Sequence, residues 1–365
     1  MKKQFIKAWV LIAVIGVLLS GCGRDTSSGS SVTSPFAPGT AATADSEAFH
    51  QDLFAMDTFM ELRAYGPEAD AALQDAAAEI RRLEGLFSVT DESSEVYAIN
   101  HSQGLPVPVS SDTLTLLRQA IAVSTQTDRA MDITVYPILR TWGFTTGEYR
   151  VPEADTIASL LQAVDDSRIQ LDQNAGTVQI PAGAELDLGA VAKGYSGDVC
   201  AALLRERGVA SALLNLGGST IRTLGRKPDG SKWRIAIQDP VDPEGYAGVI
   251  ELGDGAVNTS GGYERYFEED GETYWHILDP RTGYPAKNGL ISVTVLTDQA
   301  CYGDGLSTAL FVMGLDRAVE FWRSQDNFEF VMIDENGDLF VSQGASEAFT
   351  PMGAYETANL TVVSR

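Results

Sequence analysis

The residues Ala300–Gly314 read ACYGDGLSTALFVMG, a run in which a carboxylate and a hydroxyl stand at the start of an apolar stretch. The pattern predicts a loop that runs into a helix from Gly305. Asp304 and Thr308 are four residues apart, so on a helix they share one face. Their oxygens are hard ligands that suit Mg²⁺, which takes its remaining ligands from water and substrate phosphates. The alternative is structural: Asp304 caps the helix, and Thr308 bonds back to its own helix.

A second segment, Leu186–Asp198, places small residues between a predicted strand end and a predicted helix over Gly189–Gly208. A helix that starts there leaves backbone N–H groups free to meet an anion. Gly189 and Ala190 permit a close backbone approach, and their carbonyl oxygens can face a cation. Lys193 lies one turn into the helix, within reach of a phosphate or a ring edge. Packing of a helix on a sheet explains the small residues equally well.

A third segment, His276–Gly283, holds a compact set of polar side chains before a rigid proline turn. His276 or Asp279 can serve as a base, or can orient another reacting group. The structural alternative is that Asp279 caps the turn and pairs with Arg281.

A fourth segment carries Asp132 and Thr134, which can bond the polar groups of a ligand. The aromatic residues that follow, Trp142 and Phe144, either belong to the core or stack on a flat ring. Backbone and hydroxyl donors are also expected from two glycine-rich turns, Asn215–Ser219 and Ser260–Gly262.

Hydrophobic periodicity predicts the elements that must position these residues. Helices are expected over Pro67–Phe87, Ser110–Thr127, Asp155–Val164, Gly189–Gly208, Gly305–Met313 and Asp316–Ser324. A strand is expected over Phe49–Tyr65, a hairpin around Asn174–Gly176, and many short strands after Ala212. Because helices dominate early and strands dominate late, the fold class is α+β. We expect residues 48–365 to form a single large unit of two intimately packed lobes, with mixed or antiparallel sheets and flanking helices.

The N-terminus has the pattern of a targeting segment. Three lysines precede an apolar run, Ala8–Leu19, and the sequence Leu-Ser-Gly then leads to Cys22. This resembles a bacterial lipoprotein signal, which predicts a signal peptide over residues 1–21 and a lipidated Cys22. Residues 22–47 then form a flexible tether, and the globular part lies on the extracytoplasmic face of the cell membrane, held by its lipid anchor. The alternatives are an uncleaved anchor, or an ordinary signal in which Cys22 is incidental.

The formal net charge is -24, from 26 basic and 50 acidic residues. Such a balance argues against a nucleic-acid partner, which requires clustered cations. It also requires any phosphate-rich ligand to find local positive charge. Besides Cys22 the chain has Cys200 and Cys301, which either pair or remain two small core thiols.

Seven segments, taken in order, resemble the ApbE family of FAD:protein FMN transferases, and the resemblance extends from about Phe54 to Val341. The segments are Met56–Thr58, Met131–Thr134 with Trp142–Phe144, Asp187–Tyr195, Asn215–Gly218, Thr259–Gly261, His276–Gly283 and Asp304–Thr308.

The resemblance implies a reaction in which a threonine hydroxyl on an acceptor flavoprotein attacks FAD, FMN is transferred and AMP leaves. It implies Mg²⁺ ligands at Asp304, Thr308 and the carbonyl of Ala190. It implies flavin contacts at Met56, Ala130, Met131, Asp132, Asp187, Lys193, His276, Ile277 and Leu278. The candidate for deprotonating the hydroxyl is His276 or Asp279. The expected acceptors are Rnf-type or Nqr-type subunits or secreted flavin reductases.

The sequence departs from its relatives near Ser88, where many of them carry an aromatic residue over the flavin and this chain has Val89 and Thr90. Two other functions use the same residues. An FAD pyrophosphatase would let water replace the acceptor, and a flavin- or solute-binding lipoprotein would need no metal ligands.

Overall fold

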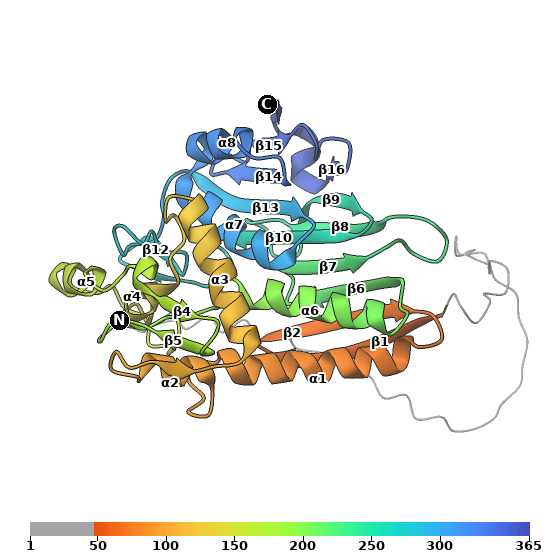
Figure 1. Ribbon diagram of the computed structural model, residues 1–365. Coiled ribbons are helices and arrows are strands. Elements are labelled where there is room, and N and C mark those ends of the chain that lie inside the picture. The colour runs from red at the N-terminus through yellow and green to blue at the C-terminus, as the bar shows by residue number, and fades with distance from the viewer. Residues whose placement is uncertain (1–46) are drawn as a thin grey trace, which may run out of the picture. The chain divides into compact units, whose positions relative to one another are not determined.

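A nine-stranded sheet is the central element of the computed structural model, which describes residues 47–365 (Figure 1). Neighbouring strands in this sheet are antiparallel except for the last two, which pair in parallel. In spatial order its strands are β1 (Ala48–Ala55), β2 (Thr58–Tyr65), β6 (Ser211–Leu216), β7 (Thr220–Leu224), β10 (Gly255–Gly261), β13 (Leu290–Thr297), β14 (Phe328–Asp334), β15 (Leu339–Ser342) and β17 (Leu360–Val363).

Smaller sheets and helices surround this sheet. The small sheets consist of β16 (Phe349–Pro351), β9 (Tyr246–Leu252) and β8 (Trp233–Gln238); β3 (Val107–Pro108), β5 (Thr177–Gln179) and β4 (Gln170–Asp172); and β11 (Tyr266–Glu269) and β12 (Glu272–Trp275). The α-helices are α1 (Ala69–Phe87), α2 (Glu95–Asn100), α3 (Ser111–Gln126), α4 (Tyr136–Thr141), α5 (Ala154–Leu161), α6 (Ala192–Glu206), α7 (Ala300–Met313) and α8 (Leu315–Arg323). Short 3₁₀ helices lie at Ile133–Val135, Asp166–Arg168 and Gly353–Thr357.

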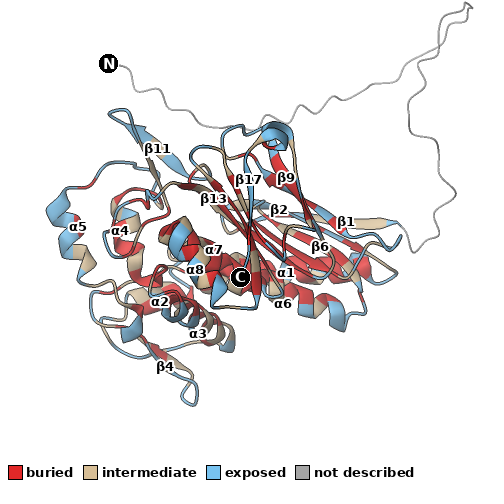
Figure 2. Cartoon of the chain, turned by 90° about the horizontal axis from the view of Figure 1, so that it is seen from above, coloured by how far each residue is buried: buried red, intermediate tan, exposed pale blue. Residues whose placement is uncertain are grey.

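The central sheet buries apolar side chains on both faces. Successive residues of a strand point to opposite faces, and β14 shows the result. Phe330 and Met332 pack with the helices, whereas Val331 and Ile333 pack with residues of β8, β9 and β16. Helices α1 and α6 cover β1, β2 and β6 on the helical face, and α7 crosses the middle of the sheet (Figures 1 and 2).

The predicted strand over 49–65 is in fact a hairpin of β1 and β2. The two residues between the strands, Met56 and Asp57, both have positive φ angles, of 51° and 60°. This is the geometry of a tight two-residue turn, which the sequence conceals because such turns usually carry Asn-Gly or Asp-Gly. The Met56 N–H donates to Glu84 Oε1 of α1 at 2.6 Å, which holds this unusual backbone in place.

Helix α7 begins at Ala300, five residues before the predicted start. The carboxylate of Asp198, on α6, accepts hydrogen bonds from the N–H groups of Ala300 at 3.0 Å and Cys301 at 2.9 Å. This cap comes from another helix, so no local sequence pattern announces it. Asp304 therefore lies in the second turn of α7, and its prediction as the helix cap is wrong.

The two helices approach each other closely at Gly194. A Cβ atom at this position would collide with the carbonyl oxygen of Ala300. The absent side chain lets the first turn of α6 lie directly on the first turn of α7, and this contact sets the position of Asp304.

The α+β prediction is confirmed, with mixed and antiparallel sheets and flanking helices. Most predicted helices and strands are present within a few residues of their predicted bounds, whereas α2, α4, β3, β16 and β17 were not predicted. Cys200 and Cys301 are both buried and unpaired. The predicted signal peptide, Cys22 and nearly all of the tether lie outside the described residues. Within residues 47–365, no helix is both long and apolar enough to cross a bilayer.

Replacing Gly194 with alanine should lower the free energy of unfolding by about 1–3 kcal/mol, because the added methyl group separates α6 from α7. The matched control is Gly85→Ala in α1, where an added Cβ meets nothing within 4 Å. That change should stabilise the protein by roughly 0.5–1 kcal/mol, because alanine is the better helix former. Urea unfolding measures both effects, and equal stabilisation by the two changes would contradict the close contact.

Candidate active site

The predicted functional residues converge on one cavity of about 460 Å³. It lies where the β1–β2 turn, the end of α1, the starts of α6 and α7 and the segment before β13 meet. The predicted residues that line it are Met56, Ala130, Met131, Asp132, Asp187, Ala190, Lys193, His276, Ile277, Leu278, Asp304 and Thr308. Twelve residues from five separate parts of the sequence thus share one site, although their individual roles stay predictions.

Asp304 is the most constrained group in this cavity. Its side chain is 7% exposed, and its carboxylate accepts three hydrogen bonds. Gly194 N–H donates to Oδ2 at 2.6 Å, while Thr220 Oγ1 and Asn258 Nδ2 donate to Oδ1 at 2.6 and 2.5 Å. A carboxylate has about four acceptor positions, so one position on Oδ2 is unused.

Hydroxyl groups gather beside Asp304. Thr308 Oγ1 and Ser307 Oγ lie 3.2 and 2.9 Å from Ser260 Oγ on β10. Both α7 hydroxyls also donate to the carbonyl oxygen of Asp304, at 3.3 Å from Thr308 and 2.9 Å from Ser307. Thr308 therefore makes the structural contact expected of it and still offers a hydroxyl oxygen to the cavity.

Opposing electrostatic effects act on the carboxyl group of Asp304. Burial raises the pKa of its carboxyl group, and the charge of Lys193 opposes that rise, together with the bonds from Thr220 and Asn258. Within residues 47–365, no cluster of three or more His, Cys, Asp or Glu side chains is arranged to hold a metal. One carboxylate with hydroxyl and carbonyl oxygens is nonetheless a donor set that fits Mg²⁺, since Mg²⁺ draws its other ligands from phosphates and water.

The start of α6 opens onto the cavity at Ala190 and Lys193. The turn before it is held by Asp187, whose Oδ1 accepts from Gly189 N–H at 2.8 Å. Burial raises the pKa of Asp187, against the opposing charges of Arg265 and Lys193. Helix α6 starts at Ala192, three residues later than predicted, because this turn precedes it.

His276 is held as a neutral imidazole. Its Nδ1 lies 3.3 Å from the carbonyl oxygen of Arg265, which can only accept, so Nδ1 carries the proton and Nε2 the lone pair. Desolvation in the cavity wall, together with the nearby charges of Arg265 and Lys193, lowers the pKa of His276 to about 4. At neutral pH the ring can therefore accept a proton but has none to spare from Nε2.

Asp279 is not among the residues that line the cavity. Its Oδ1 accepts from the backbone N–H of Arg281 at 2.9 Å and from Arg281 Nε at 3.0 Å. These are the contacts of the structural alternative, a capped turn with a local ion pair.

The wall around Asp132 contains an acidic cluster. Asp132 Oδ1 accepts from Thr134 N–H at 2.8 Å, and its Oδ2 lies 2.7 Å from Arg129 Nη2. Asp166, which is 2% exposed, lies beside them with Oδ2 unpartnered. Burial and then the charge of Asp132 raise the pKa of Asp166 to about 6. The contacts with Thr134 and Arg129 thus hold the Asp132 side chain in place without a ligand.

The two aromatic residues predicted near this wall, Trp142 and Phe144, lie in different environments. Trp142 is fully buried, and its Nε1 donates to the carbonyl oxygen of Gly283 at 2.9 Å. Phe144 lines the cavity together with Phe87, Val89 and Thr90. Within residues 47–365, Phe144 and Phe87 are therefore the phenyl rings in the cavity lining.

Sequence reasoning missed three residues that position the site. Thr220 and Asn258 hold Asp304 from β7 and β10, and Glu84 holds the turn at Met56. Asn258 had a signal, since it stands immediately before the quoted Thr-Ser-Gly segment. Thr220 and Glu84 had none, because their partners are 84 and 28 residues away along the chain.

The sequence profile of the ApbE family matches residues 56–332, most of the described part of the chain. The chain belongs to the ApbE family. Curated relatives named FAD:protein FMN transferase include one from Klebsiella pneumoniae, 36% identical over 77% of this chain and 88% of its own length. Another, from Salmonella typhimurium, is 31% identical over 92% of this chain and 94% of its own length.

Solved ApbE structures share the fold. The ApbE protein of Thermotoga maritima superposes with a TM-score of 0.78 at 32% identity, covering 83% of this chain and 99% of its own. The flavin transferase ApbE from Vibrio cholerae gives 0.71 at 29% identity, covering 85% and 98%. The ApbE resemblance found in the sequence is thereby confirmed over nearly the whole globular part.

Proposed function

We propose that this chain transfers FMN from FAD to a threonine hydroxyl of an acceptor flavoprotein and releases AMP. One observation carries the proposal: a desolvated carboxylate with an unused acceptor position stands beside hydroxyls and Lys193 in an ApbE cavity. Phosphoryl transfer depends mainly on positioning and charge stabilisation, which such an arrangement provides.

The proposed reaction balances as a single displacement. The acceptor oxygen forms a bond to the FMN-side phosphorus, and the bond from that phosphorus to the bridging oxygen breaks. The bridging oxygen leaves with AMP, and the hydroxyl proton passes to a base on the protein or to solvent. The phosphoester on the threonine replaces one P–O bond with another, so no external energy source is needed.

Asp304, Thr308 and the carbonyl of Ala190 are the proposed Mg²⁺ ligands. The bound ion would neutralise charge on the pyrophosphate oxygens. Lys193 and Arg265 add fixed positive charge to a lining that also carries several carboxyl side chains. An anionic dinucleotide would therefore depend on the bound Mg²⁺ as well as on these two residues.

His276 is the proposed base, since its Nε2 carries a lone pair and its ring lines the cavity. Asp279 is proposed only to shape the turn that follows. The half of the cavity formed by Met56, Ala130, Met131, Ile277 and Leu278 is proposed to hold the flavin ring.

We further propose that Cys22 is lipidated and that the enzyme works on the extracytoplasmic face of the cell membrane. Its acceptors would be flavin domains that face the same side, such as Rnf-type or Nqr-type subunits or secreted flavin reductases. The pattern of residues 1–22 and the acidic composition support this location, because charge alone would not hold the protein on an anionic bilayer.

Asp304→Asn should reduce FMN transfer by about 100-fold or more, because the neutral amide neither attracts Mg²⁺ nor offsets its charge. Asp316→Asn, on the first turn of α8, is the matched control and should leave activity unchanged. Purified protein is incubated with FAD, Mg²⁺ and an acceptor domain, and acceptor mass and AMP are measured.

Transfer that persists with chelator present would contradict the metal site. AMP released equally fast without acceptor would instead identify a pyrophosphatase, and FAD binding without any AMP would identify a carrier. Thr308→Val provides a second, milder variant, and thermal unfolding confirms that each variant is folded.

His276→Gln should lower kcat by roughly 10²–10⁴-fold if His276 is the base, with FAD affinity nearly retained. The wild-type rate should be flat from about pH 6 to 8 and fall only as the pH approaches 4, where His276 takes up a proton. Asp279→Asn should keep most activity. The assignment of His276 fails if Asp279→Asn is the more damaging change.

Cys22→Ser should abolish acylation, because serine has no thiol to carry the lipid, so the mass of the acyl groups should be missing from the variant chain. Fractionation followed by mass measurement of the mature chain distinguishes the outcomes. A wild-type protein whose first residue is an unmodified Cys22, or lies elsewhere, would exclude the lipid anchor.

A further inference from the structure

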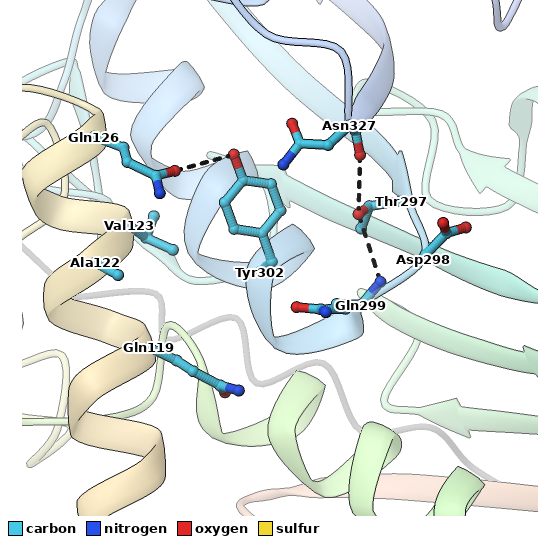
Figure 3. Close-up of a pocket in the computed structure, with 9 residues that line it drawn as sticks. All are labelled: Gln119, Ala122, Val123, Gln126, Thr297, Asp298, Gln299, Tyr302 and Asn327. Carbon is cyan, nitrogen blue, oxygen red and sulfur yellow. Dashed lines mark hydrogen bonds between the residues drawn. The ribbon is translucent and has the colours of Figure 1, made fainter.

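A second cavity, of about 370 Å³, lies apart from the site described above, between α3 and the start of α7 (Figure 3). Helix α3 contributes one wall, and the segment that joins β13 to α7 contributes the other, with one residue from the loop before β14. Its lining residues are Gln119, Ala122, Val123, Gln126, Thr297, Asp298, Gln299, Tyr302 and Asn327. None of these residues lines the first cavity.

The lining is rich in carboxamides and poor in charge. Four of the nine residues are Gln or Asn, and the single ionisable carboxylate is that of Asp298. No lysine, arginine or histidine lines the cavity, so nothing there balances a phosphate or a carboxylate. The lining therefore selects an uncharged molecule, or a cation, over an anion.

Hydrogen-bonding capacity in this cavity is not used by the fold. Gln119 Oε1 is buried and has no partner, an arrangement that costs roughly 1–3 kcal/mol. The Tyr302 hydroxyl makes only a long bond of 3.3 Å to Gln126 Oε1. Rotation of the Gln119 carboxamide would bring this oxygen to a ligand N–H in the cavity, and a ligand acceptor would compete for the Tyr302 hydroxyl.

The lining includes one aromatic ring, on which a flat ligand can stack. The ring of Tyr302 stands between the Gln126 side of α3 and the loop that carries Asn327 (Figure 3). Ala122 and Val123 add apolar surface next to the carboxamides.

We propose that this second cavity binds an uncharged planar ring with neighbouring N–H and acceptor groups, which is the chemistry of a nucleobase. A carboxamide pairs with such an edge through two parallel hydrogen bonds, one donated and one accepted, as Asn and Gln do with adenine. A volume of about 370 Å³ is within the ordinary range for a small-molecule site. This inference does not rest on the proposed function.

The second cavity is lined in part by α7, the helix that carries the proposed metal ligands Asp304 and Thr308. Gln299 immediately precedes α7, and Tyr302 lies two residues before Asp304. A ligand in the second cavity would contact the first turn of α7 while Asp304 and Thr308 lie one and two turns further on. The second cavity therefore adjoins the helix that carries Asp304 and Thr308.

The test uses 8-bromoadenosine as the probe, because bromine can be located in crystals by its anomalous scattering. We expect an anomalous peak between Gln119 and Tyr302, and saturable binding by calorimetry that survives excess FAD. Gln119→Leu should weaken this binding about ten-fold, the equivalent of one lost hydrogen bond. Tyr302→Phe should weaken it by a similar factor.

The matched control is Gln74→Leu, the same change at an exposed position on α1, which should leave the affinity unchanged. An anomalous peak only in the first cavity, or only ordered water in the second, would overturn the proposal. Binding seen only at crystal concentrations would also overturn it, as would equal affinity of Gln119→Leu and the wild type for 8-bromoadenosine. Loss of FMN transfer is measured separately, so failure of the proposed function would not be mistaken for failure of this site.

Discussion

The site depends on a reciprocal arrangement of two helix starts. Asp198 of α6 accepts from the first two N–H groups of α7, and Asp304 of α7 accepts from the third N–H group of α6. Each helix thus supplies the carboxylate that satisfies the open end of the other, where the positive end of the helix dipole stabilises a negative charge. Gly194 makes the arrangement feasible, because any side chain there would push the two helices apart.

This arrangement bears on the ionisation of Asp304, a buried carboxyl group that we propose binds a cation. Burial alone would favour the protonated, neutral form of Asp304. Three donors and the nearby charge of Lys193 favour the ionised form, and the opposing effects meet at one side chain. Asp304 lies on α7 and its three donors lie on α6, β7 and β10, so all four elements must be folded for the carboxylate to be held in place. Asp198 is in turn held by Arg222, which is nearly buried and also contacts Asp254.

The lining of the cavity combines two chemistries. Its oxygen ligands and the positive charges of Lys193 and Arg265 suit a pyrophosphate, whereas Met131, Phe144 and Ile277 offer apolar surface to a ring. The turn at Met56 belongs to the second group, and its left-handed backbone is held by Glu84 from α1. A non-glycine residue keeps such a conformation only where the surroundings impose it.

The sequence by itself determined the α+β class, most of the helices and strands, and the set of segments that form the cavity. The class and the elements follow from local patterns of apolar spacing and glycine-rich turns, whereas the set of segments follows from the resemblance to the ApbE family. Tertiary structure alone decided that α7 starts at Ala300, that residues 49–65 form a hairpin, and that Asp279 lies outside the cavity while His276 lies in it. Each of these features depends on a partner that is distant in the chain, such as Asp198 for the start of α7 and Glu84 for the turn. Local sequence patterns cannot predict such contacts, because the two partners become neighbours only when the chain folds.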